Sequence, residues 1–293
     1  MKSYNPKEWS RFLLSVGKAD TLRKLFPLLV VVAAYSWGIA YLEMEVFRLS
    51  ATSNFKNISL LHTLLGFALS MLLVFRTNTA YERWWEGRKL WGSLVNNSRN
   101  LAIKMNALLP HDDVQNRRFF AQVIARFVFE LKTHLQLEET RYALDEEPHP
   151  EIPTFDHNKH VPNQVSSIIT SRIILLYNQQ KITAEQMLFV NGEVSSFLDI
   201  CGACERIKNT PIPYSYSSFI KKFILMYTLT LPIGYVFNLG YLVVPVVVLV
   251  FYALASLELI AEEIEDPFGK DANDLPMQKI VENIQKHVAE ILI

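Results

Sequence analysis

Residues 75–100 read "FRTNTAYERWWEGRKLWGSLVNNSRN", and they join an apolar run to a charged one with no Gly or Pro before Gly87. The residues before this stretch are mostly apolar, whereas the stretch itself brings arginines, tryptophans and carboxylates. Trp, Arg and Lys collect where a helix leaves the membrane, because their side chains reach toward the headgroups. The stretch therefore predicts one long helix that crosses the membrane and continues into the cytoplasm, so that Arg76 reaches headgroups and the two parts are mechanically coupled.

Four apolar stretches approach the roughly 20 residues that a helix needs to cross a bilayer. They are residues 25–42, 58–75, 223–239 and 241–260. None has an ionised residue at its centre, where one would cost roughly 2.5–3.5 kcal/mol. The first 24 residues are polar, and no small-residue cleavage site follows the first apolar run, which argues against a cleavable signal peptide. We expect four transmembrane helices rather than four buried helices of a soluble protein.

The distribution of positive charge predicts the orientation of the chain. Residues 1–24 hold six Lys and Arg, residues 43–57 hold two, and the link between the last two spans holds none. Both termini and the central region are therefore expected in the cytoplasm. The expected segments are a cytoplasmic amphipathic lead-in (1–24), two spans (25–75), a cytoplasmic helical domain (76–222), two further spans (223–260) and a cytoplasmic C-terminal segment (261–293).

The central region has the apolar periodicity of helices and no alternating runs typical of strands. One proline-rich stretch, residues 145–162, has the composition of an exposed linker between two helical halves. Near the C-terminus, apolar residues at helical spacing predict a short amphipathic helix. The fold class is therefore all-α, with four membrane helices and a helical cytoplasmic domain. The balanced charge, 29 basic against 29 acidic residues, gives no indication of a nucleic-acid partner.

The second span carries a stripe of small and weakly polar residues. At about 100° per residue, an arc of about 60° contains five of them. They are Ser59, Thr63, Gly66, Ser70 and Thr77. Such a stripe suits close helix packing through small residues or the wall of a pore that Phe67, at its edge, would narrow. In the second case several copies of the chain must surround one axis, because four helices can hardly enclose a channel and also bury their own polar faces.

Three ordered motifs resemble the bacterial branch of the bestrophin family of ion channels. They are the stretch quoted above, "TPIPYSY" at residues 210–216 and "EEIEDPFGKDANDLP" at residues 262–276. The resemblance implies a homopentamer in the bacterial inner membrane that conducts small monovalent ions passively through one axial pore. It implies no enzymatic activity and no cofactor. It also implies an apolar neck within the membrane and a second constriction in the cytoplasmic part.

The neck of the family has three bulky apolar residues at successive i, i+4 steps on the second span. The match at "GF" places Phe67 innermost and leaves Thr63 and Ser59 for the other two positions, where this sequence offers hydroxyls instead. A rotation by one residue would bring Leu60 and Leu64 forward. For the cytoplasmic constriction, the resemblance suggests two residues one helical turn apart. These are Ile173 and Tyr177.

Eukaryotic members of the family bind calcium just after the fourth span. On this sequence the resemblance places the side-chain carboxylates of that site at Asp271 and Asp274, a backbone carbonyl at Asp266, and Glu263 nearby. Lys270, Ala272 and Asn273 interrupt the run of acids, and calcium prefers six to eight oxygen ligands. The sequence therefore weighs against calcium regulation and allows a simpler role for Asp274 as a helix cap.

The ion that passes is predicted from the charges near the pore. Glu43 and Glu45 lie in the outer loop, and hydroxyls line the proposed stripe, which favours a monovalent cation such as sodium. Arg48 and Lys56 in the same loop weaken this preference, and eukaryotic members conduct chloride. A chloride channel is therefore the alternative function.

Two further motifs offer weaker alternatives. Cys201 and Cys204 have the spacing of a redox pair, but a helical context and a reducing cytoplasm favour two buried thiols over a membrane oxidoreductase. His157 and His160, with Asp156 and His149, contain enough donors for a metal, but they lie in the proline-rich stretch, where solvated histidines are far more common. His62, beside the stripe, is either a titrating pore residue or a buried hydrogen-bonded one.

Overall fold

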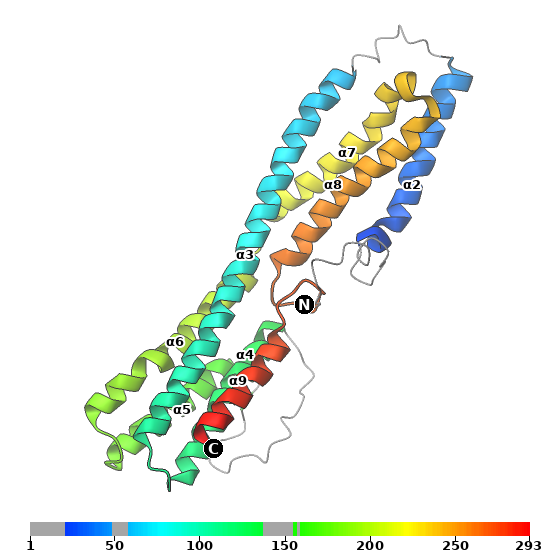
Figure 1. The fold of residues 1–293 in the computed structure, drawn as a ribbon. Coiled ribbons are helices and arrows are strands. Elements are labelled where there is room, and N and C mark those ends of the chain that lie inside the picture. Colours follow the sequence, from blue (N-terminus) through cyan, green and yellow to red (C-terminus); the bar gives the residue numbers. More distant parts are fainter. Residues whose placement is uncertain (1–20, 49–57, 137–154, 157–158) are drawn as a thin grey trace.

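The computed structural model describes residues 21–48, 58–136, 155–156 and 159–293 (Figure 1). These residues contain helices and short connections and no strand, as the sequence predicts. Most of the N-terminal lead-in, the outer loop with Lys56 and most of the proline-rich stretch lie outside them. The helices are α2 (Thr21–Tyr41), α3 (Ile58–Leu108), α4 (Val114–Gln136), α5 (Val161–Asn178), α6 (Ala184–Asn209), α7 (Tyr214–Leu239), α8 (Val243–Glu265) and α9 (Met277–Leu292), with short turns η1 (Leu42–Val46) and η3 (Gly240–Leu242).

Helix α3 is the long helix that the quoted stretch predicts. It contains 51 residues without a proline, and at a rise of 1.5 Å per residue it is about 75 Å long. Two bundles share it, an upper one with α2, α7 and α8 and a lower one with α4, α5, α6 and α9 (Figure 1). The predicted continuity of this helix is therefore confirmed.

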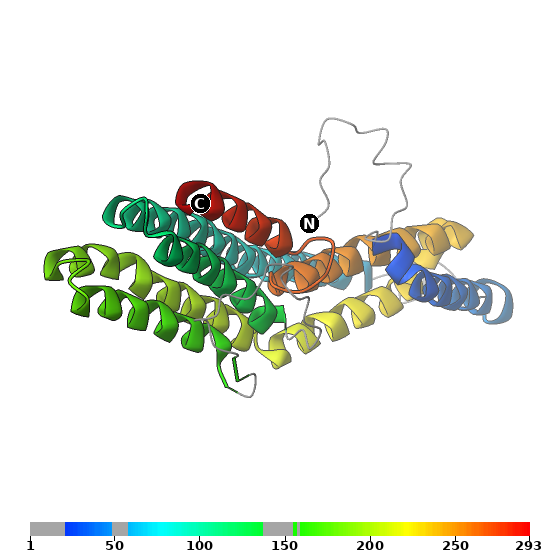
Figure 2. The same ribbon diagram turned by 90° about the horizontal axis from the view of Figure 1, so that it is seen from below.

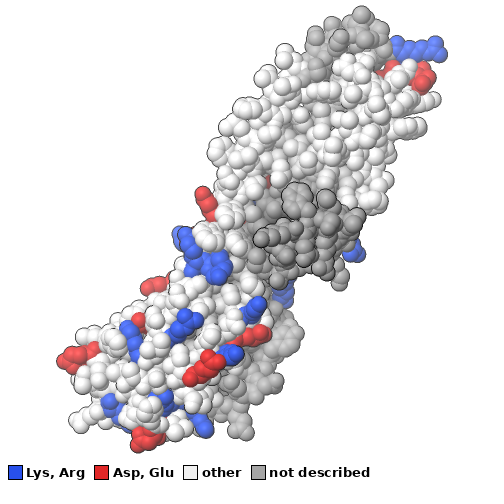
Figure 3. All heavy atoms as spheres, viewed as in Figure 1, with Lys and Arg blue, Asp and Glu red and all other residues white. Residues whose placement is uncertain are grey.

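The upper bundle has the surface of a membrane domain. α7 and α8 lie between α3 and α2, and the four helices alternate in direction (Figure 1). In Figure 3, the visible face of the upper bundle is almost free of charged side chains below its tip. Large apolar side chains on its surface are exposed, among them Val31, Met226 and Leu249. Its interior is also apolar and includes Leu29, Leu69, Leu73, Ile224, Val247 and Phe251.

Length and composition identify four stretches of the described residues that are able to span a membrane. They are Thr21–Val46, Leu60–Leu108, Ala184–Asn209 and Tyr214–Glu265. The last contains both α7 and α8, which form a hairpin turned at Gly240, whose φ of 52° favours glycine. α6 belongs to the lower bundle and has Glu193 and Asp199 in its middle. We therefore assign the crossings to α2, the upper part of α3, α7 and α8, as the sequence predicts.

The lower bundle has its own core. Seen from below, α9 lies on one side of α3 and α4, and α5 and α6 lie on the other (Figure 2). α9 turns one apolar side inward, with Met277, Val281, Ile284 and Val288 buried, so the predicted terminal helix is confirmed. The core gathers buried side chains from all five segments, among them Trp91, Phe120, Phe127, Val165, Phe197 and Met277. Charged side chains gather on this end of the molecule (Figure 3).

Candidate functional site

The upper half of α3 has one side buried against α7 and α8 and an opposite side that is exposed. The buried side is a row of residues at helical spacing. It consists of His62, Leu69, Leu73, Arg76 and Ala80. The exposed side is apolar and bulky, and we call it the outward face of α3. It consists of Leu60, Leu64, Phe67, Met71, Val74 and Phe75. Because α7, α8 and α2 all lie on the other side of α3, the outward face has no partner among the residues that the structure describes.

The predicted polar stripe lies on the flank between these two sides. Gly66 is turned toward α7, where a Cβ atom would stand 2.7 Å from the Tyr227 hydroxyl oxygen. The interpretation of Gly66 as pore-lining is therefore wrong, because it serves close helix packing instead. Thr63 and Ser70 are exposed and Thr77 is half-buried, while the side chain of Ser59 lies outside the described part.

The hydroxyls of the stripe are bound to the backbone of their own helix. Ser70 Oγ donates to the Gly66 carbonyl at 2.8 Å, and Thr77 Oγ1 donates to the Leu73 carbonyl at 2.8 Å. Such bonds to the carbonyl four residues earlier are common for Ser and Thr within helices. The hydroxyl protons are therefore committed to the helix, and each oxygen keeps two lone pairs that accept hydrogen bonds from any solvent beside it.

Phe67 stands on the outward face with 68% of its side chain exposed. At about 100° per residue, Met71 lies directly opposite the centre of the buried row, and Phe67 and Phe75 lie within about 40° of that direction. Thr63 lies about 80° from it, toward the flank. A row of bulky apolar residues at i, i+4 and i+8 thus runs from Phe67 toward the cytoplasmic end.

His62 is a buried residue. Its side chain is 2% exposed and its Nε2 lies 2.9 Å from Thr230 Oγ1. The rings of Tyr227 and Tyr235 meet the imidazole edge-on. Of the two alternatives for His62, the structure supports the hydrogen-bonded one.

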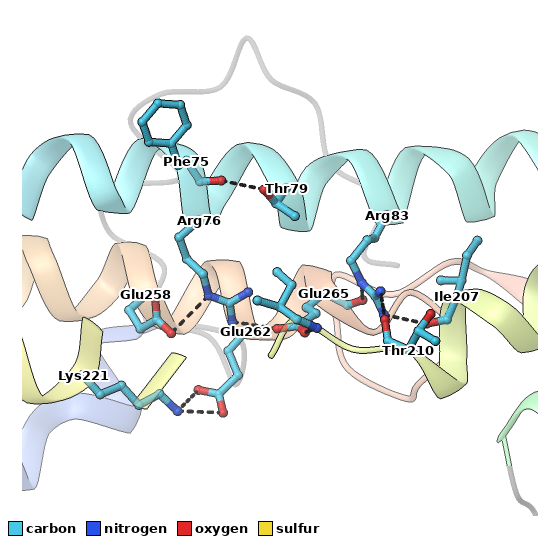
Figure 4. A network of polar contacts seen from close by, with 11 residues as sticks. Phe75, Arg76, Thr79, Arg83, Ile207, Thr210, Lys221, Glu258, Glu262 and Glu265 are labelled. Atoms are coloured by element: carbon cyan, nitrogen blue, oxygen red, sulfur yellow. Dashed lines mark hydrogen bonds and ion pairs between the residues drawn. The ribbon is translucent and has the colours of Figure 1, made fainter. Parts of the chain in front are cut away.

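Arg76 anchors the junction between the two bundles. Its guanidinium is 1% exposed, with Nε 3.4 Å from Glu258 Oε1 and Nη2 2.7 Å from Glu265 Oε2 (Figure 4). The expectation that Arg76 reaches lipid headgroups is therefore wrong. Its charge is compensated by two carboxylates from α8, which lie about 180 residues later in the sequence.

Arg83, two turns further along α3, holds three backbone carbonyls. Nε donates to the Glu265 carbonyl at 3.1 Å, Nη1 to Thr210 at 2.5 Å and Nη2 to Ile207 at 2.6 Å (Figure 4). The carboxylate of Glu265 accepts the Ile212 amide at 2.6 Å. All three sequence motifs, from α3, from the α6–α7 turn and from the end of α8, thus meet at one junction.

The four acidic residues after the fourth span do not form a set of metal ligands. The structure groups no three of their carboxylates within 4.8 Å of one another among the described residues. Glu263 accepts from Lys24 Nζ and Asn273 Nδ2, each at 2.6 Å, and Asp266 accepts the Phe268 amide at 3.3 Å. These bonds hold Glu263 against α2 and the segment against itself, which gives both acids a structural role.

Asp274 holds the turn of this segment together. Its Oδ2 accepts the Asp271 amide at 2.5 Å, and its side chain is 2% exposed. Burial raises the pKa of Asp274 from an ordinary value near 3.8 to about 6. The hydrogen bond to Asp271 opposes this shift but does not cancel it. Asp274 is therefore a structural acid in a turn.

The two residues suggested for a cytoplasmic constriction differ in exposure. Ile173 is 5% exposed and belongs to the core of the lower bundle, whereas Tyr177 is 43% exposed near the end of α5. Ile173 therefore does not line a pore in this arrangement. Its neighbour Ile174 is 46% exposed.

Cys201 and Cys204 are buried thiols on one side of α6. Burial raises the pKa of Cys201 to about 12 and raises that of Cys204 further. Thiol chemistry needs the thiolate, so the redox alternative has no support from this geometry.

We predict that Arg76→Met destabilises the protein by about 3–5 kcal/mol, because it leaves the buried Glu258 and the partly buried Glu265 without a counter-charge. Lys221→Met is the matched control. It breaks a half-exposed pair with Glu262 at 2.9 Å and should cost at most about 1 kcal/mol. Thermal melting of both variants in detergent tests this. Equal melting temperatures for the two variants would contradict the assignment of the junction.

We predict that Asp274→Asn stabilises the protein above pH 6. The folded state binds the Asp274 proton more tightly than the unfolded state, so the wild type loses stability as pH rises from about 4 to 6. The uncharged side chain of the variant does not titrate and so avoids this loss, which is on the order of 1–3 kcal/mol. The difference in stability between variant and wild type should therefore vanish below about pH 4. Melting temperatures at pH 4, 5 and 8 test this. A variant less stable than the wild type at pH 8 would instead show that the carboxylate serves a bound cation.

Comparison with known proteins gives one consistent family. The family model described as "Bacterial/Fungal Bestrophin protein" matches residues 1–290. The chain is 30% identical over 298 residues to the voltage-dependent anion channel-forming protein sll1024 of Synechocystis sp., covering 99% of this chain and 94% of the relative. It is 35% identical over 231 residues to protein alr2987 of Nostoc sp., which has the same description, covering 76% and 74%.

The solved structures agree with the sequence relatives. A crystal structure of a bacterial bestrophin homolog from Klebsiella pneumoniae, carrying a point mutation, superposes with a TM-score of 0.80 at 25% identity, covering 92% of this chain and all of that one. The relatives are described as channels and not as enzymes. This multi-pass membrane protein belongs to the bacterial and fungal bestrophin family.

Proposed function

We propose that the protein is a homopentameric channel of the bacterial inner membrane, with both termini in the cytoplasm, and that it conducts small monovalent ions passively. The observation that carries this proposal is the outward face of α3, which is bulky, apolar and uncovered by any other part of the described chain. α7 and α8 fill the space between α3 and α2, so a water-filled path has to lie outside the single chain and be shared among copies. The number five comes from the family resemblance.

The outward face of α3 supplies a neck for this channel. Phe67, Met71 and Phe75 stand one helical turn apart on the side opposite the buried row. Rings of such residues around an axis form a narrow apolar passage that gates by dewetting. We therefore keep Phe67 at the neck and favour Met71 and Phe75 over Thr63 and Ser59. For the cytoplasmic constriction, further along the chain, we propose the exposed pair Ile174 and Tyr177 in place of Ile173 and Tyr177.

We predict that Phe67→Ala, Met71→Ala and Phe75→Ala each raise unitary conductance by about twofold or more, because each widens an apolar ring. Leu249→Ala on α8 is the matched control. It truncates an apolar residue that is 66% exposed on the surface of the upper bundle and should leave conductance unchanged. Planar bilayer recordings of variants that still assemble as pentamers test this. An increase for Thr63→Ala with none for Met71→Ala would restore the neck of Phe67, Thr63 and Ser59.

The hydroxyl geometry favours cations, with sodium as the proposed ion. The donors of Ser70 and Thr77 are committed to the helix, so these oxygens present only acceptors to water. An anion needs hydrogen-bond donors in place of its hydration shell, and these hydroxyls supply none. Glu45 is exposed at the outer end, where a carboxylate attracts cations, and no Lys or Arg lies on α3 between Ile58 and Phe75.

Anion conduction is the second candidate, and a specific observation supports it. The relatives from Synechocystis and Nostoc are both described as forming voltage-dependent anion channels. The outward face of α3 carries Lys89 as well as Glu82 beyond the membrane part. Beyond the membrane part, this face therefore presents a positive charge to an anion as well as a negative one to a cation.

The reversal potential under a salt gradient separates the two candidates. With a NaCl gradient across a planar bilayer, cation selectivity moves the zero-current voltage toward the sodium equilibrium potential. Anion selectivity moves it toward the chloride potential, with the opposite sign. Replacing sodium by a large organic cation should abolish the current if sodium carries it. A sign that corresponds to chloride would overturn the sodium proposal, and no unitary current with any salt would overturn the channel itself.

A further inference from the structure

Three elements of the lower bundle bring a carboxylate and two imidazoles together. His134 is near the end of α4, His160 is the N-cap residue of α5, and Glu205 is in the last turns of α6. His134 Nε2 and His160 Nε2 lie 2.6 Å and 2.5 Å from Glu205 Oε1. The ring centroids of the two histidines are 4.5 Å apart. We call these three residues the His–His–Glu cluster.

The cluster has the donor set of a transition-metal site. Its three ligand atoms all lie within 4.8 Å of one another. Zinc binds imidazole nitrogen at about 2.0–2.1 Å and carboxylate oxygen at about 2.0–2.2 Å, which puts neighbouring ligands of a tetrahedron about 3.3 Å apart. Each nitrogen–oxygen separation has to grow by only about 0.8 Å, which side-chain rotation of the glutamate allows. Catalytic and other open zinc sites combine His and Glu in the same way.

The cluster is also accessible to a cation from solvent. Each of the three side chains is about 30% exposed, so a water molecule has access to a fourth position. We propose that His134, His160 and Glu205 form a Zn²⁺ site that links α4, α5 and α6.

Binding has a defined proton requirement. A neutral imidazole that ligates through Nε2 carries its proton on Nδ1. In the structure, His160 Nδ1 instead accepts the Asn163 amide at 3.2 Å, as the cap of α5. Metal binding through both Nε2 atoms therefore moves two protons, one on each imidazole, from Nε2 to Nδ1. On His160 this ends the cap bond from Asn163, because Nδ1 then carries a proton, and the zinc–nitrogen bond forms at Nε2. No redox step is involved.

Zinc suits this site better than calcium or magnesium. Calcium takes six to eight oxygens and magnesium prefers oxygen in an octahedron, whereas two imidazoles and one carboxylate match borderline metals. Cys201, one turn before Glu205, is buried as a thiol because burial raises its pKa to about 12. The ligand set is therefore two nitrogens and one oxygen, with water in the open position.

Cobalt(II) is the spectroscopic probe for the test, with Zn²⁺ as competitor. Full-length protein in detergent should bind one Co²⁺ per chain, with the visible absorption of four- or five-coordinate cobalt, and Zn²⁺ should remove it. His134→Ala and Glu205→Gln should lose the bands and weaken Zn²⁺ binding by about 100-fold, since even changes behind the ligands cost about 10–100-fold. His287→Ala is the matched control. It removes a histidine that also lies near a carboxylate, 3.5 Å from Glu290 Oε2 on α9, and should change nothing.

A measurement on the wild-type protein tests the proposal without depending on whether the variants fold. Zn²⁺ binds the folded state, so it should raise the melting temperature of the wild type in the absence of chelator and not in its presence. Binding weaker than about 100 µM, or equal binding by His134→Ala, would overturn the proposal. The same holds for an intense sulfur-to-cobalt absorption, which would assign the metal to the cysteines. The outcome does not depend on whether the protein conducts ions.

Discussion

The structure depends on one backbone constraint: within lipid, every amide and carbonyl has to be bonded inside its own helix. α3 satisfies this requirement over its membrane half and then continues without a proline into water. Because the helix is unbroken, its rotation is the same in both bundles. One helix rotation therefore determines which side of α3 is buried in each bundle. In the upper bundle it is the row against α7 and α8, and in the lower bundle it is the side that carries Trp91. Any surface that α3 turns toward a pore is set by the same rotation.

At the junction, ion pairs and hydrogen bonds connect α3 to elements of both bundles. Arg76 meets two carboxylates of α8, and Arg83 collects carbonyls from the end of α8 and from the α6–α7 turn. Trp84 donates to the Asn273 carbonyl at 3.0 Å, which adds the C-terminal segment. Close approach is needed here, since a Cβ at Gly87 would stand 3.1 Å from Pro267. The C-terminal segment and α3 are therefore in direct contact at this junction.

The sequence predicts those features that depend on neighbours along the chain. The four spans, the length of α3 and the amphipathic α9 follow from local periodicity and hydropathy. The errors concern distant partners. Arg76 looked like a headgroup anchor because Glu258 and Glu265 come about 180 residues later, and Gly66 looked pore-lining because Tyr227 is on another helix. The His–His–Glu cluster was missed for the same reason, since His134 and Glu205 are 71 residues apart.

The position of the Arg76 junction directly below the proposed apolar neck has a physical reason. The outward face of α3 from Leu60 to Phe75 carries no charge, so this face has no Coulomb energy with which to hold an ion. The compensated charges of Arg76, Glu258 and Glu265 begin one residue later but point the opposite way, into α8. The charge needed to lock the two bundles is thereby kept away from the proposed pathway. Neutralising it internally allows α3 to be anchored on one side and, between Leu60 and Phe75, free of fixed charge on the other.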